Sequence, residues 1–342
     1  MDYKKNMETE ELTHKLLEWY QTSGRDLPWR VKGHAHPAPY IVLVSEIMLQ
    51  QTTVKTVIPY FEKFIQRFPN VESLAQAELE EVYRYWQGLG YYTRAKSLHQ
   101  TAQIIMEKYN GKFPSDKEDI KKLKGLGAYT VASFLALAFN RPETAIDGNV
   151  TRIICRLYHL TSPVDSIKKE IETRASQLTS QDNAADYTSA IMDLGATVCT
   201  KQKPNCLLCP WSKACQSKGQ ADVEQIPVKN KIEKKQKQGA VYLIYNQKGE
   251  IFITKRSKGL LSGLYEFPWT DDIFHPLLEQ SQNTQKSVNH IFTHINLTLQ
   301  IHKAQTDTPK LEGKFVPMNE LSAYPMSTLM KKVIKAAGIN VS

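Results

Sequence analysis

Two acidic side chains lie in stretches of sequence that would bury them. Glu46 sits within the apolar run IVLVSEIML, and Asp147 precedes an apolar stripe in AIDGNVTR. A buried carboxylate is costly, so Glu46 either reaches solvent from one side of its helix or has a raised pKa that can be used for chemistry. Asp147 is also well placed as the N-cap of a helix, which is the commonest reason for such an aspartate.

A pair of carboxyl groups of this kind suits cleavage of a glycosidic bond. One acid protonates the leaving group, while the other stays ionised and stabilises an oxocarbenium-like transition state. Between them in the sequence lies LKGLGAYT, in which Gly125 and Gly127 precede an apolar helix. Glycines there let backbone N–H groups approach a phosphate, so the stretch predicts either a DNA-binding helix-hairpin-helix or an ordinary interhelical turn.

Four of the five cysteines fall within residues 199–215, with the spacing C-x6-C-x2-C-x5-C: Cys199, Cys206, Cys209 and Cys215. Four thiolates in one short loop can surround a zinc ion or an iron–sulfur cluster, and the spacing alone leaves both open. Neighbouring lysines make the loop basic, which suits contact with phosphate. The fifth cysteine, Cys155, lies on an apolar stripe and is expected in the core.

The elements that position these groups change in kind near residue 239. Before it, apolar residues at three- and four-residue spacings predict helices at 11–20, 54–68, 95–109 and 150–160. After it, 240–256 reads as two strands joined by a turn, followed by a strand at 295–304 and a helix at 328–337. We therefore expect a helical domain over 1–225, a lysine-rich linker over 226–238 and an α+β domain over 239–342.

The length, charge and composition of the chain indicate which binding partners and which cellular compartment to expect. A chain of 342 residues has room for about two domains, and its net charge of +9 weakly favours a polyanionic partner. No apolar run is long enough to cross a membrane, and the N-terminus has no secretory signal, so we expect a cytoplasmic protein. In a reducing compartment the cysteine cluster indicates metal rather than disulfides.

Five stretches carry a specific resemblance. SEIMLQQT, GLGYYTRAKSLH, LKGLGAYT, AIDGNVTRI and the cysteine loop resemble, in this order, the helix-hairpin-helix DNA glycosylases, and among them the MutY family. The resemblance covers nearly the whole chain. It implies a mainly α-helical glycosylase domain with a helix-hairpin-helix and an iron–sulfur loop, plus a Nudix-like α+β C-terminal domain. It also implies a monofunctional adenine DNA glycosylase of base excision repair, which flips adenine out of a mispair with 8-oxoguanine or guanine and hydrolyses its N-glycosidic bond.

The same resemblance assigns roles to the residues of the chemistry. Glu46 would be the general acid, Asp147 would stabilise the sugar cation, and Asn149 would orient that carboxylate. Tyr129 stands where related bifunctional glycosylases have a lysine that forms a Schiff base, and a tyrosine cannot form one, so Tyr129 would assist a monofunctional reaction. The four cysteines would hold one 4Fe–4S cluster.

The resemblance also implies contacts to DNA or to the extruded base. In the helical domain they fall on Arg25, Gln51, Thr52, Leu89, Tyr91, Gly125 and Gly127. Ser189 departs from the pattern, because family members often have glutamine or glutamate there, and it puts one adenine contact in doubt.

The second domain resembles a Nudix fold without its catalytic signature. No R-E-x-x-E-E pattern follows Phe267, so we expect a recognition domain rather than a second hydrolase. The stretch IFTHIN resembles the loop that tests for 8-oxoguanine. In it Phe292 would wedge into the duplex, Thr293 would hydrogen-bond, and His294 would contact the lesion or its phosphate.

The expected partner is double-stranded DNA with an adenine:8-oxoguanine or adenine:guanine mispair, bound by a monomer associated with the nucleoid and with no membrane. Two alternatives remain: a bifunctional glycosylase/lyase of the endonuclease III type that acts on oxidised pyrimidines, and a non-catalytic iron–sulfur protein that binds DNA or senses redox state. Tyr129 and the extra domain disfavour the first, and the intact pair of Glu46 and Asp147 disfavours the second.

Overall fold

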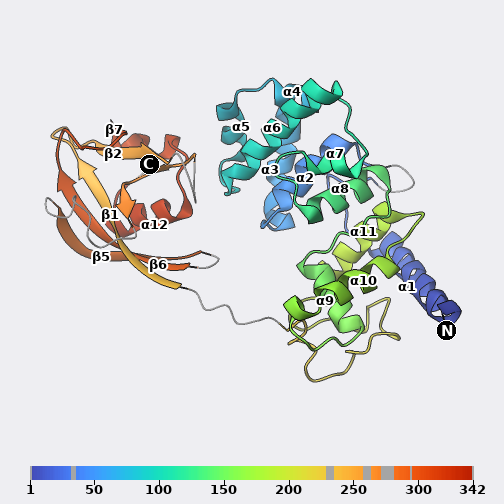
Figure 1. Ribbon diagram of the computed structural model, residues 1–342. Coiled ribbons are helices and arrows are strands. Elements are labelled where there is room, and N and C mark those ends of the chain that lie inside the picture. Colours follow the sequence, from blue (N-terminus) through green and yellow to red (C-terminus); the bar gives the residue numbers. More distant parts are fainter. Residues whose placement is uncertain are drawn as a thin grey trace. The chain divides into compact units, whose positions relative to one another are not determined.

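The computed structural model describes residues 2–31, 36–228, 235–256, 263–270, 281–292 and 295–340, without side chains for 2–8. These residues form two compact units, one helical and one built on a β-sheet (Figure 1). Thr293 and His294 lie outside the described residues, so their predicted roles concern a part of the chain without a structural account. None of the described helices is long and apolar enough to cross a membrane.

The helical unit contains the helices that the apolar spacing predicts. The predicted segments 11–20, 54–68, 95–109 and 150–160 correspond to α1 (Asp2–Ser23), α3 (Val54–Arg67), α6 (Tyr92–Tyr109) and α9 (Gly148–Leu157). The other elements are α2 (Pro39–Leu49), α4 (Val71–Ala75), α5 (Leu79–Trp86), α7 (Lys117–Lys121), α8 (Ala128–Phe139), η1 (Val164–Ser166), α10 (Lys168–Leu178), α11 (Ala184–Asp193) and η2 (Leu194–Val198).

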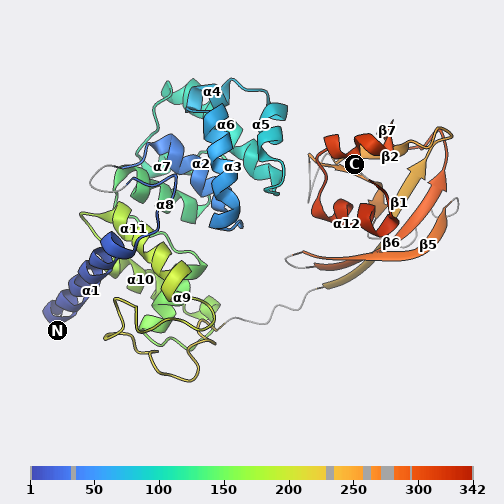
Figure 2. The ribbon, with the colours of Figure 1, turned by 180° about the vertical axis from the view of Figure 1, so that it is seen from behind.

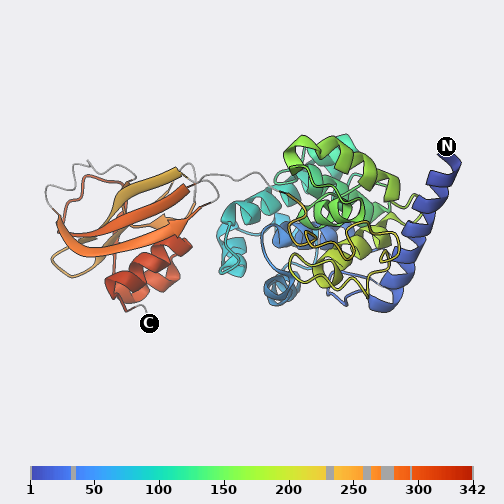
Figure 3. The same cartoon turned by 90° about the horizontal axis from the view of Figure 1, so that it is seen from below.

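Two packing arrangements position the acidic residues. The apolar stripe of α9 is buried with α10 and α11, and α1 lies along these helices at one side of the unit (Figure 3). Cys155 is part of that core, as expected, with no exposed surface. Helix α2 packs against α3 and α8 and is buried along most of its length, Glu46 included. A helix that is apolar all round belongs in a core, so Glu46 cannot turn toward bulk water.

The second unit is a mixed sheet with a helix on one face. Its strands are β1 (Lys235–Tyr245), β2 (Ile251–Lys255), β3 (Tyr265–Glu266), β4 (Trp269–Thr270), β5 (Gln282–Ile291), β6 (Ile295–Gln305) and β7 (Lys314–Val316). The main order is β3-β2-β1-β6-β5, with β1 and β6 parallel and the other pairs antiparallel. After η4 (Met318–Ala323), helix α12 (Thr328–Ala337) packs on the sheet at β5 (Figure 2).

The predicted linker is shorter in the structure than its composition suggests. Strand β1 begins at Lys235 and pairs with β6 from that residue on, so the last four residues of the predicted 226–238 segment are strand. At the other end, Ile226 is buried in the core of the helical unit, and the carbonyl of Val228 accepts a hydrogen bond from Val164 N at 3.0 Å. Strand pairing is a backbone interaction, so a lysine-rich composition does not exclude it.

The glycine turn predicted at 123–130 joins α7 to α8 as a helix-hairpin-helix. Gly125 has φ +78°, a left-handed conformation that favours glycine, and a Cβ added there would lie 2.6 Å from Ser97 Cβ. Gly127 caps α8 with an ordinary φ of −76°, and no atom lies within 4 Å of where its Cβ would be. The conformation of the turn therefore requires a glycine at position 125. At Gly127 the backbone is open, so that a ligand could approach its N–H group.

We predict that Gly125→Ala destabilises the protein by about 1–3 kcal/mol, because alanine is strained at positive φ and Ser97 must also shift. Gly127→Ala is the matched control and should cost less than about 1 kcal/mol, since only a helix cap changes. Denaturant unfolding of both variants measures the difference. Equal losses of unfolding free energy would contradict this account of the turn.

Candidate active site

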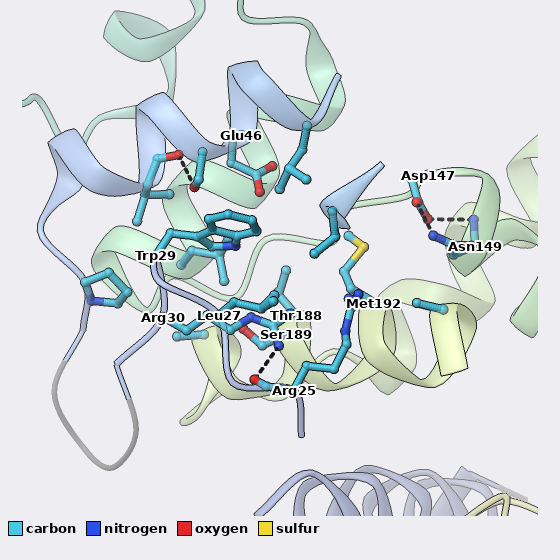
Figure 4. A pocket seen from close by; sticks show the side chains of 18 of the residues that line it. Arg25, Leu27, Trp29, Arg30, Glu46, Asp147, Asn149, Thr188, Ser189 and Met192 are labelled. Atoms are coloured by element: carbon cyan, nitrogen blue, oxygen red, sulfur yellow. Dashed lines mark hydrogen bonds between the residues drawn. The ribbon is translucent and has the colours of Figure 1, made fainter. Parts of the chain in front are cut away.

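A cavity of about 590 Å3 lies in the helical unit between α2, α11, the segment at residues 25–31 and the start of α9 (Figure 4). Its volume is typical of sites that enclose a small molecule. The four residues predicted to carry the chemistry all line it: Glu46, Tyr129, Asp147 and Asn149. They come from three helices that are distant in sequence, and the fold brings them to one cavity.

Glu46 projects from α2 into this cavity and is only 8% exposed (Figure 4). Burial raises the pKa of its carboxyl, and the nearby charge of Asp147 raises it further. Ser133 Oγ donates to Glu46 Oε2 at 2.6 Å, and this bond, with Arg30 and Tyr129, lowers the pKa in part. The balance is a raised pKa, so the protonated acid is favoured over a wider pH range than for an exposed glutamate.

Asp147 is the N-cap of α9, one of its two predicted roles, and it also lines the cavity. Its Oδ1 accepts hydrogen bonds from the backbone N–H of Asn149 at 2.7 Å and of Val150 at 2.8 Å. Asn149 Nδ2 donates to its Oδ2 at 2.9 Å (Figure 4). The two acids of the cavity therefore have opposite surroundings, one apolar and one rich in donors.

Asn149 is held from its other side as well. Arg152 NH2 donates to Asn149 Oδ1 at 2.8 Å and to the carbonyl of Gly195 at 2.7 Å. Gly195 allows this close packing, because a Cβ there would lie 2.6 Å from Asn149 Cβ. With both ends of its amide engaged, Asn149 can orient the Asp147 carboxylate.

Tyr129 occupies the first turn of α8 and points its hydroxyl toward the same cavity. Burial raises its pKa well above the usual value, and the charges of Glu46 and Asp147 add to the effect. The hydroxyl lies 3.8 Å from Met192 Sδ. Tyr129 is thus a neutral phenol near both carboxyl groups, able to donate or accept one hydrogen bond.

A buried ion cluster forms another wall of the cavity. Asp193 has no exposed surface and binds two arginines: Arg30 donates to its two oxygens at 2.7 and 2.9 Å, and Arg25 donates through its backbone N at 2.8 Å and Nε at 2.7 Å. Burial alone would raise the pKa of Asp193, but these arginines bring it below the usual value. Arg25, predicted at the base pocket, therefore lines the cavity and is held in place by Asp193.

The remaining walls of the cavity consist of an aromatic side chain and short polar side chains. Trp29 is 6% exposed and packs edge-on against Phe61, with ring centroids 5.3 Å apart. Ser189, the departure from the family pattern, lies on α11 beside Thr188 and faces the cavity (Figure 4). The side chain there is short and carries a hydroxyl, where a glutamine or glutamate would reach further into the cavity.

The other predicted DNA contacts lie in different places. Gln51 and Thr52 follow α2 at the cavity. Leu89 and Tyr91 lie between α5 and α6, where Leu89 is buried and Tyr91 is 59% exposed. Phe292, in the second unit, is partly buried against the core, and its ring centroid lies 4.6 Å from that of His290.

The four predicted metal ligands line a second, smaller cavity in the loop after η2. Burial raises the pKa of the Cys209 thiol to about 12, and the charges of the other three cysteines contribute. Arg156, only 2% exposed, donates from NH1 toward Cys199 Sγ at 3.6 Å and to the carbonyl of Thr200 at 2.6 Å. Within the described residues, no three His, Cys, Asp or Glu side chains form a metal-ion site.

Comparison with known proteins identifies the family. Residues 44–181 match the model of the HhH-GPD superfamily of base excision DNA repair proteins, and residues 240–336 match that of the NUDIX domain. An adenine DNA glycosylase from Buchnera aphidicola (subspecies Baizongia pistaciae) is 39% identical over 256 residues, which cover 74% of this chain and 72% of the relative. The chain belongs to the adenine DNA glycosylase family. Another member, from Mus musculus, is 30% identical and matches 94% of this chain and 76% of the relative.

Solved structures agree with the fold of the helical unit. A thermostable thymine-DNA glycosylase is 28% identical, with a TM-score of 0.55, and covers 62% of this chain and 97% of that protein. A trapped endonuclease III–DNA intermediate, 22% identical with a TM-score of 0.50, has the same fold and covers 61% of this chain and 96% of that protein. The predicted fold class is thereby confirmed: a helix-hairpin-helix glycosylase domain followed by a Nudix-like α+β domain.

Several residues of the site have no individual signal in the sequence. Ser133 lies 87 residues from the carboxyl group to which it donates, and Arg30 and Asp193 are 163 residues apart. His36, which precedes α2, also lines the cavity. The apolar run around Ser133 is the only hint, since a buried hydroxyl needs a partner.

We predict that Asp193→Asn lowers the unfolding free energy by about 3–5 kcal/mol, because two half-buried arginines lose the charge of a fully buried carboxylate. The folded-state pKa of Asp193 is depressed, so its contribution is present above the unfolded value of 3.8 and is lost as the pH falls through the lowered folded value. The stability gap between wild type and variant should therefore narrow below about pH 4. Asp182→Asn, at an exposed position, is the control. A gap that stays constant down to pH 2 would show that the cluster does not act through its charge.

Proposed function

We propose that this chain removes adenine from mispaired DNA by hydrolysis of its N-glycosidic bond, as a monofunctional glycosylase of base excision repair. The observation that carries the proposal is the pair of carboxyl groups at one cavity, with Glu46 buried and its pKa raised, and Asp147 held by N–H donors. Two acids in opposite surroundings suit opposite roles in cleavage of a glycosidic bond.

In this mechanism Glu46 protonates the purine ring as the bond to the sugar breaks. A protonated base is a better leaving group, and the raised pKa keeps the proton on Glu46 to higher pH than on an exposed glutamate. Asp147 stabilises the positive charge that develops on the sugar, with its carboxylate fixed by Asn149. Water then completes the hydrolysis.

The walls of the cavity suit a flat, polar base. Trp29 offers an apolar surface, while Thr188 and Ser189 offer hydroxyls and Arg25 a cation. The ring nitrogens of adenine accept hydrogen bonds and its amino group donates them, so such a mixed lining can bind it. With Ser189 in place of a longer amide or acid, we propose that part of the hydrogen bonding to adenine passes through water.

Tyr129 supports a monofunctional reaction over the lyase alternative. A bifunctional glycosylase needs an amine that attacks the sugar, and the position after the hairpin carries a phenol near both acids. The non-catalytic alternative is disfavoured by the burial of Glu46, because a carboxyl buried in an apolar helix is costly without a use.

For the substrate we propose duplex DNA with adenine opposite 8-oxoguanine or guanine, bound by a monomer in the cytoplasm at the nucleoid. The helix-hairpin-helix would bind the phosphate backbone through Gly125 and Gly127. The Nudix-like domain would test the opposite base through the segment that includes Phe292, Thr293 and His294. Phe292 packs against its own core in the structure, so its insertion into DNA would require it to leave that contact.

We also propose that Cys199, Cys206, Cys209 and Cys215 hold one 4Fe–4S cluster. Four half-buried thiols that line one cavity fit a group with four thiolate ligands. When bound, the cluster would fix the basic loop between its ligands in one conformation. Arg156, which donates to carbonyls on that loop and toward Cys199 Sγ, would hold the loop against α9.

Glu46→Gln tests the activity. We expect excision of adenine opposite 8-oxoguanine to fall by at least about 100-fold, the scale of lost general acid catalysis, while DNA binding survives. The assay is single-turnover excision, with strand breaks read before and after alkali. Wild type should give breaks only after alkali. Near-normal excision by the variant, or strand cleavage by wild type without alkali, would contradict the mechanism.

Purified protein should contain about four irons per chain, and Cys206→Ser should lose them. Cys155→Ala removes a buried cysteine that lies in the core rather than in the cysteine cavity, and should keep its iron. Metal analysis of anaerobically prepared protein makes the measurement. One zinc per chain with no iron would exclude the cluster.

A further inference from the structure

Arg94 is a buried cation that the proposed chemistry does not use. It lies in the first turns of α6 and is 8% exposed. Its NH1 donates to the carbonyls of Ile47 at 3.1 Å and Met48 at 2.8 Å, and also to that of Gln50. Its NH2 donates to Thr52 Oγ1 at 3.1 Å. One guanidinium thus binds both the last turn of α2 and the residues that follow it.

The carbonyls that Arg94 binds are those that a helix leaves without partners at its C-terminus. A positive charge there also interacts favourably with the helix dipole. A planar guanidinium can reach several acceptors at fixed angles, which a lysine ammonium cannot do in the same way. Arg94 therefore defines where α2 ends and how the chain leaves it.

The turn that Arg94 holds forms part of the cavity wall. Gln50, Gln51 and Thr52 all line the cavity, directly after the helix that carries Glu46. Gln51 has φ +56°, a left-handed conformation that is unfavourable for a residue with a side chain. Such a conformation persists only where the surroundings impose it, and strain of this kind is often found at functional sites.

A second contact ties the same turn to the glycine hairpin. Gln50 Nε2 donates to the carbonyl of Gly125 at 3.2 Å and to Thr130 Oγ1 at 3.2 Å. The backbone of Gln50 is held by Arg94, and its side chain is held by the hairpin. The segment expected to bind a phosphate and the segment at the cavity are therefore linked through one residue.

We propose that Arg94 is a positioning residue for the Gln50–Thr52 turn. By fixing the conformation of this turn, Arg94 allows it to keep the target nucleotide out of the duplex while the linked hairpin binds the DNA backbone. This inference rests on the proposed function. Arg94 acts through Gln51 and Thr52, and its role is in extrusion of the base rather than in bond cleavage.

The test compares a substrate that requires extrusion with one that does not. The first is a duplex with adenine paired to 8-oxoguanine, and the second has adenine opposite an abasic site, where less stacking and pairing energy is lost. We expect Arg94→Met to excise adenine at least about tenfold more slowly from the first, because small misplacements at a site are costly, and less than about threefold more slowly from the second. A 2-aminopurine placed beside the adenine should become less fluorescent in the complex with Arg94→Met than in the complex with wild type, because the base step opens less.

Three further variants make the result decisive. Arg94→Lys keeps the charge without the planar fork and should recover part of the loss. Thr52→Val removes one acceptor, leaves the backbone carbonyls bound, and should reproduce part of the loss even if Arg94→Met folds poorly. Arg174→Met makes the same substitution in α10, where Arg174 binds Glu170 on the surface, and should behave as wild type.

Equal slowing on both substrates by the Arg94 and Thr52 variants would overturn the inference, because it would indicate a general structural role. Unchanged rates and fluorescence in Arg94→Lys and Thr52→Val would overturn it as well. A wild-type protein that excises adenine from neither substrate would instead refute the proposed function, so the two failures are distinguishable.

Discussion

The site depends on one carboxyl group that the fold takes out of water. Helix α2 is buried along most of its length, and Glu46 is buried with it. An ionised carboxylate there would lose its hydration, so burial favours the protonated acid. The few polar groups around Glu46 reduce the free-energy cost of ionising its buried carboxyl without removing that cost. Ser133 donates one hydrogen bond to it, and Arg30 acts at longer range while it is paired with Asp193.

The neighbouring structure keeps this arrangement in place. Asp147 lies at the N-terminus of α9, where it accepts hydrogen bonds from the backbone N–H and the side-chain amide of Asn149. Arg152 binds Asn149 and also donates from Nε to the carbonyl of Cys199 at 2.8 Å, so the start of α9 is linked to the cysteine loop. The end of α2 is set by Arg94. Both carboxyl groups are therefore on helices whose termini are fixed by arginines rather than by packing alone.

The sequence predicts the helices and strands better than the contacts between residues that are distant in the chain. The periodicity of α9 and α12 was sufficient to locate them, because one apolar face of each is buried. Strand β5 gave no signal, since Val288 is its only buried residue among those described and β6 holds it through backbone bonds. The start of β1 has a linker-like sequence for the same reason, because backbone bonds to β6 hold it. The chemistry of Glu46 and Asp147 was predicted from their types and settings. Ser133, Arg30 and Asp193 were not, because contacts between residues this far apart depend on the tertiary fold.

The central claim is that burial keeps Glu46 protonated so that it can act as the acid. The most direct test is the pH dependence of single-turnover adenine excision by wild type and by Ser133→Ala, with the exposed Ser176→Ala as control. The hydrogen bond from Ser133 lowers the pKa of Glu46, so its removal should raise that pKa. The alkaline fall in rate should then move to higher pH in Ser133→Ala and stay in place in Ser176→Ala. An alkaline limb that does not move, or moves to lower pH, would contradict the account.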